Sequence, residues 1–129
     1  MSPENKIKLN LLRKKLDTLD NVLLKIIQKR TDIVKKVLSL KSSKNEIVDK
    51  KRISSILNKI KKESLKKKID PKITHRVWKN MIWSYIDFEK RNFKKKSITN
   101  NIDPKITNRI WKNMIWSYID FEKRNLKKK

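Results

Sequence analysis

Residues 11–41 read LLRKKLDTLDNVLLKIIQKRTDIVKKVLSLK, and this stretch decides the fold. It contains neither Gly nor Pro, and its apolar residues recur at steps of three and four, the spacing of one face of an α-helix. We expect one amphipathic helix from about Asn5 to Leu40. At the usual helical rise it would be about 50 Å long. Short helices of the same chain cannot cover such a length, so we expect a second copy to cover the rest, in a homodimer.

Two shorter helices are predicted after a polar connection that runs from Lys41 to Ile47. Asp49 can cap the second helix through its side-chain oxygen. The third helix begins at Asp70-Pro71, because a cap residue followed by proline at the first helical position is a strong start signal. The apolar face of the second helix carries Ile53, Ile56, Leu57 and Ile60.

The sequence of the third helix occurs twice. Ile69 to Lys96 reappears as Ile102 to Lys129, 33 residues further on. The copies differ only at His75/Asn108, Val77/Ile110 and Phe93/Leu126. Such near-identity indicates a local duplication and not a solenoid, which needs about three or more stacked repeats. We therefore expect an all-α fold with a helical domain over residues 1–96 and an appended duplicate of the third helix over residues 97–129.

The two copies compete for one place in a three-helix protomer. We expect residues 69–93 to occupy it, because their connection to the second helix is short. The second copy repeats Glu89 as Glu122. Left exposed, its apolar residues would form a patch prone to association. The alternatives are docking on the same protomer or exchange between two copies.

The charge is strongly positive, with 37 Lys and Arg against 13 Asp and Glu and a formal net charge of +24. Such a field attracts polyanions, so a nucleic-acid-binding protein is one alternative. The abundance of Lys, Asn and Ile without Gly or Ala is also typical of an AT-rich coding sequence. A small anionic substrate suits a cationic protein equally well. No zinc-finger, RRM, KH or homeodomain pattern is present, and we expect no specific nucleic-acid partner.

Several other classes of protein are excluded or disfavoured by composition. The chain has no Cys and a single His, which excludes a disulfide framework and a metal site built from cysteines or several histidines. It shows neither a signal peptide nor an apolar run of about 18 residues. We therefore expect a cytoplasmic protein without a membrane span.

Three segments, in order, resemble the all-helical chorismate mutases: residues 11–41 quoted above, IVDKKRISSIL (47–57) and IDPKITHRVWKNMIWSYIDFE (69–89). The resemblance extends from residue 7 to about residue 93. It implies an intertwined homodimer of three-helix protomers that acts as an isomerase and converts chorismate to prephenate in aromatic amino acid biosynthesis. It also implies that no cofactor and no metal take part.

The resemblance places the substrate contacts on Arg13, Arg30, Lys41, Asp49, Arg52 and Glu89. Arg13 would come from the partner subunit, and Lys41, Glu89 and Arg30 would be the catalytic groups. The residue types suit a compact dicarboxylate, since guanidinium forks bind carboxylates and a fixed cation stabilises developing charge. Taken singly, each cation could equally belong to the solvated surface, and Glu89 could form an ion pair with one of the many lysines.

One position departs from the pattern of many mutases. They carry Glu after the second-helix Arg, whereas this chain has Ile53 after Arg52. In this respect the chain is more similar to the subgroup that contains the isochorismate pyruvate lyases. The sequence therefore leaves three alternatives to the mutase: the lyase, a nucleic-acid-binding helical protein, and a dimer that the duplication has inactivated.

Overall fold

The computed structural model describes residues 1–93 and 102–126, and every regular element in this part of the chain is a helix. The helices are α1 (Pro3–Leu40), α2 (Lys50–Lys66), α3 (Pro71–Asn92) and α4 (Pro104–Leu126), with a short 3-10 turn at Lys44–Glu46. The all-α class is therefore confirmed. The expected boundary between residues 96 and 97 lies outside the described residues.

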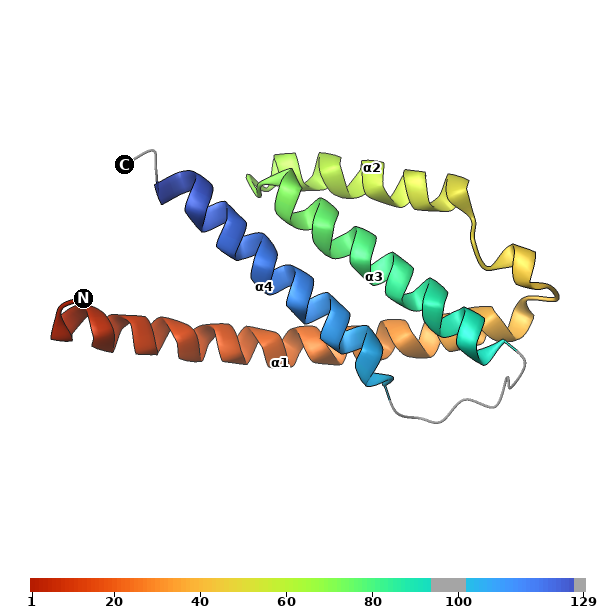
Figure 1. The fold of residues 1–129 in the computed structure, drawn as a ribbon, viewed down its shortest axis with the longest axis horizontal. Coiled ribbons are helices and arrows are strands. Elements are labelled where there is room, and N and C mark those ends of the chain that lie inside the picture. Colours follow the sequence, from red (N-terminus) through yellow and green to blue (C-terminus); the bar gives the residue numbers. More distant parts are fainter. Residues whose placement is uncertain (94–101, 127–129) are drawn as a thin grey trace.

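The central helix is α3, which lies between α2 and α4 and also packs on α1. Figure 1 shows α1 as the long lower element, with α3 and α4 running in opposite directions beside each other above it. Since α1 has 38 residues and α3 and α4 have 22 and 23, each of these two helices is much shorter than α1.

Side-chain oxygens of Ser2, Asp49, Asp70 and Asp103 cap the four helices. The Asp49 side chain accepts from the backbone N–H of Arg52, and the Asp70 side chain accepts from that of Lys72. The predicted starts of the second and third helices are therefore confirmed. Each cap satisfies a backbone donor that the first helical turn cannot satisfy itself.

The turn between α2 and α3 requires a left-handed residue. Lys68 takes this conformation, with φ of 58°. The N–H of Ile69 donates to the carbonyl of Ser64, and the N–H of Lys68 donates to that of Leu65. Glycine usually occupies this position after a helix, but the chain contains none.

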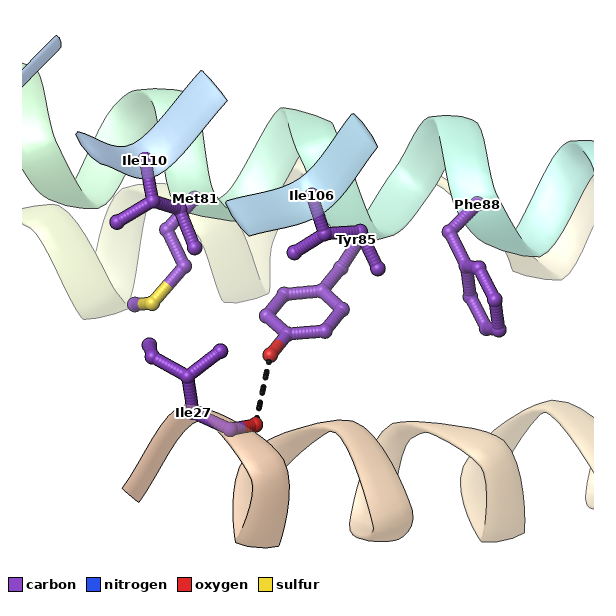
Figure 2. Close-up of a cluster of buried hydrophobic side chains, with 6 residues drawn as sticks. All are labelled: Ile27, Met81, Tyr85, Phe88, Ile106 and Ile110. Atoms are coloured by element: carbon purple, nitrogen blue, oxygen red, sulfur yellow. Dashed lines mark hydrogen bonds between the residues drawn. The ribbon is translucent and has the colours of Figure 1, made fainter. Parts of the chain in front are cut away.

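The core joins three helices (Figure 2). It consists of Ile27 from α1, Met81, Tyr85 and Phe88 from α3, and Ile106 and Ile110 from α4. Ile106 and Ile110 are 0% and 1% exposed, so the duplicated helix docks on its own protomer. This was one of the three arrangements that the sequence left open.

The first half of α1 lies outside this core. Leu11, Leu12, Leu16 and Leu19 are 55–63% exposed, which agrees with the expectation that the chain's own helices leave part of α1 uncovered. The homodimer itself stays a prediction. None of the described helices carries an apolar stretch long enough to span a bilayer.

Candidate functional site

A buried ion pair joins the end of α1 to the last turns of α3. The Nζ atom of Lys41 lies 2.7 Å from Oε2 of Glu89, and the two side chains are 16% and 8% exposed. Lys41 directly follows α1, and its backbone N–H donates to the carbonyl of Leu38, which is fully buried. The helix end therefore fixes the base of the Lys41 side chain.

Burying two charges carries a desolvation cost that only a close pair offsets. Removal of one member leaves an uncompensated charge, whereas an anionic ligand could replace the carboxylate beside Lys41. The arrangement thus holds a cation and a carboxyl group side by side in a largely water-excluded place. The sequence offered two roles for Glu89, a substrate contact or an ion pair with a lysine. The ion pair is present, and its lysine, Lys41, is itself one of the expected substrate contacts.

The hydroxyl groups of Thr31 and Tyr85 also link α1 and α3. Oγ1 of Thr31 donates to the carbonyl of Ile27 at 2.8 Å and lies 2.8 Å from the Tyr85 hydroxyl. That hydroxyl also lies 3.3 Å from the Ile27 carbonyl, as Figure 2 shows. Tyr85 precedes Glu89 by one helical turn, so this link fixes the part of α3 that presents the carboxyl group.

Burial raises the pKa of Tyr85 above its ordinary value of 10.0, while the Thr31 bond and the positive charge of Arg30 act in the opposite direction. Tyr85 therefore stays protonated at neutral pH and keeps its hydrogen to donate.

Arg30 lies outside the buried face of α1. The buried line of α1 is formed by Leu23, Ile27, Thr31, Val34 and Leu38. Arg30 is exposed and follows an adjacent line, in which Ile26, Ile33 and Val37 are 41–60% exposed. The physical reason is that α1 has two neighbouring apolar lines, and α3 and α4 together cover only one.

Three further expected contacts, Arg13, Asp49 and Arg52, are also exposed. Asp49 uses a carboxylate oxygen to cap α2 through the N–H of Arg52. Arg13 lies in the uncovered half of α1. Of the six expected contacts, the structure thus brings Lys41 and Glu89 into direct contact.

Thr31 and Tyr85 were not among the expected site residues. Thr31 interrupts the apolar line between Ile27 and Val34, and a buried hydroxyl needs a hydrogen-bonding partner. That interruption is the sequence signal which could have identified it.

The second copy of the helix does not occupy this site. Glu122, the counterpart of Glu89, is exposed, and Tyr118, the counterpart of Tyr85, is 50% exposed. The acid beside Lys41 comes from α3.

Comparison with known families shows the family to which this fold belongs. The model of the family described as chorismate mutase type II matches residues 12–90. This chain belongs to the chorismate mutase type II family. The match includes Lys41 and Glu89 and ends before α4. Membership supports chorismate mutase activity, an isomerisation, with chorismate as the substrate. No curated protein and no solved structure matches the chain.

Proposed function

We propose that this member of the chorismate mutase family rearranges chorismate to prephenate at a site built around Lys41 and Glu89. The observation that carries the proposal is their buried contact of 2.7 Å, which joins the ends of two helices within the matched region.

The reaction is an intramolecular pericyclic rearrangement, which needs no nucleophile, base or metal. A protein accelerates it by holding the reactive shape and by stabilising charge on the breaking ether oxygen. Lys41 supplies a fixed positive charge for this purpose. When the dicarboxylate binds beside Lys41, Glu89 loses its partner, takes up a proton and donates a hydrogen bond to the ether oxygen.

The remaining contacts bind the two carboxylates and the hydroxyl of the substrate. Arg30 and Arg52 offer guanidinium forks, and Asp49 is the acceptor for the hydroxyl. Arg13 comes from a second copy of the chain. The exposed leucines of α1 support that homodimer, because association of this half of α1 would bury them and bring Arg13 to the neighbouring copy.

The proposal is tested by incubating the purified chain with chorismate and identifying the product. We expect prephenate, and we expect Lys41→Ala to lower kcat/KM by about 100-fold or more, the usual effect of removing a group that stabilises transition-state charge. Lys44→Ala is the matched control, because Lys44 is exposed in the same connection. Equal activity of the two variants would contradict the site.

The second candidate activity is the isochorismate pyruvate lyase, which is favoured by Ile53 in the position after Arg52. It acts on a similar dicarboxylate and would convert isochorismate to salicylate and pyruvate. Parallel assays with the two substrates separate these activities. Turnover of neither substrate would indicate a family fold that has lost its catalysis.

A further inference from the structure

Helices α3 and α4 lie side by side in opposite directions (Figure 1) and share the most extensive contact between helices of the described chain. Four ion pairs with N–O distances of 2.8–3.0 Å join them: Arg76–Asp120, Arg109–Asp87, Arg91–Asp103 and Arg124–Asp70. Their side chains are partly exposed, so each pair contributes modestly by itself.

These pairs are reciprocal. Because the copies are offset by 33 residues, Arg76 is equivalent to Arg109 and Asp87 is equivalent to Asp120. Each of the four ion pairs therefore has an equivalent among the other three. The amides follow the same rule: Nε of Arg76 donates to Asn113, and Nε of Arg109 donates to Asn80. A contact in which each side presents the same residues to the other is isologous, the kind that two-fold dimers form.

Equivalent residues of α3 and α4 are equally buried in the contact between these helices, but not elsewhere. Ser84 and its counterpart Ser117 are 4% and 3% exposed, and each is therefore covered to the same extent. Tyr85 and its counterpart Tyr118 are 6% and 50% exposed, because α1 covers this part of α3 and not of α4. The symmetry thus belongs to the α3–α4 contact and does not extend to the packing on α1.

We propose that the face of α3 covered by α4 is a self-association surface, and that α4 occupies in cis the place which α3 of a second copy takes in trans. Each arginine, aspartate and asparagine by which α4 and its cap pair with α3 has an identical counterpart in α3 or at its cap. In trans, Arg76 pairs with Asp87 of the second copy, and Arg91 pairs with Asp70 of the second copy. The inference does not depend on which reaction the chain catalyses.

Covalent linkage makes α4 a strong competitor. A tethered segment acts at an effective concentration in the millimolar range, whereas a second copy must bind from solution. The appended helix therefore limits pairing between the α3 helices of two copies, although the surface for that pairing is intact.

Two double variants separate cis pairing from trans pairing. Arg109→Asp/Asp120→Arg places like charges opposite Asp87 and Arg76 within one chain, but leaves α3 unchanged for pairing between copies. Arg76→Asp/Asp120→Arg keeps opposite charges within the chain, but places like charges between the α3 helices of two copies. Both variants keep the net charge of +24, so the overall electrostatic repulsion between two copies is the same for both.

The association constant of each full-length variant is measured by sedimentation equilibrium at one salt concentration. We expect Arg109→Asp/Asp120→Arg to associate at least about 10-fold more tightly than Arg76→Asp/Asp120→Arg, because two ion pairs change sign in each case. Association through α1 contributes equally to both and cancels in the comparison. Equal constants, or the reverse order, would overturn the proposal.

Circular dichroism checks that the variants keep their helix content. If Arg109→Asp/Asp120→Arg loses helix, Arg76→Asp/Asp87→Arg replaces it, since this variant also disrupts pairing within the chain and preserves it between copies. The combination of all four substitutions restores both modes of pairing and should associate like the unmodified chain. A combination that stays as tightly associated as Arg109→Asp/Asp120→Arg would contradict the mechanism.

Discussion

The hydroxyl of Tyr85 ties α3 to α1 within the core, and its duplicate provides a control. Tyr85→Phe removes this hydroxyl and leaves Thr31 bonded to the Ile27 carbonyl, so we expect the free energy of unfolding to fall by about 1 kcal/mol. Tyr118→Phe changes the same residue type at a position that is 50% exposed. It should alter the free energy of unfolding by less than about 0.5 kcal/mol. Urea unfolding measures both variants. Equal losses of stability would show that the Tyr85 hydroxyl contributes no more than the exposed Tyr118 hydroxyl.

Lys68 offers a second prediction for a single residue. Its φ of 58° is unfavourable for a side chain with a Cβ atom, so Lys68→Gly should raise the free energy of unfolding by up to about 1 kcal/mol. Lys67→Gly is the control, because Lys67 has φ of −89° and should gain nothing from glycine. Thermal or urea unfolding provides the comparison. A gain of stability in both variants would contradict the conformational explanation.

At the scale of helices, the sequence was sufficient where a local signal decides the structure. Asp49 and Asp70-Pro71 fix the starts of α2 and α3, since capping depends on residues within one turn. The covered line of α1 could not be predicted in the same way. Two apolar lines lie next to each other on that helix, and only the tertiary position of α3 and α4 selects the line containing Thr31 over the line containing Arg30.

The caps of α3 and α4 predict how acid weakens this pair of helices. The N–H of Lys72 is the main cause that lowers the pKa of Asp70 below 3.8, and Arg124 adds to it against the effect of burial. Burial acts to raise the pKa of Asp103, but the N–H of Lys105 and the charge of Arg91 outweigh it, and this pKa is also lowered.

Both carboxylates therefore stabilise the fold above their unfolded pKa of 3.8, and this contribution is lost as the pH falls further. Asp70→Asn/Asp103→Asn should keep the caps but remove the titration. We expect the double variant to be less stable than the unmodified chain at about pH 6, and we expect this difference to shrink as the pH falls below 3.8. Urea unfolding across this pH range tests the expectation. A difference in the free energy of unfolding that does not change with pH would contradict it.

At the scale of the whole molecule, the two copies of the third helix have nearly the same sequence and the same local propensities. Sequence favoured residues 69–93 for the site only through their short connection, and it left the position of the second copy open. The structure gives the two copies different surroundings: Glu89 lies beside Lys41, while Glu122 is exposed. Their contact with each other could not be predicted, because it depends on how both helices lie on α1.

The most direct test of this account compares the two equivalent acids, Glu89→Gln and Glu122→Gln, in the pH profile of kcat/KM for prephenate formation. Glu89 can donate to the ether oxygen only while it is protonated, so the activity of the unmodified chain should fall as the pH rises. We expect Glu122→Gln to retain this profile and Glu89→Gln to make it flat. A flat profile in the unmodified chain, or one flattened by Glu122→Gln alone, would contradict the assignment of the site to α1 and α3.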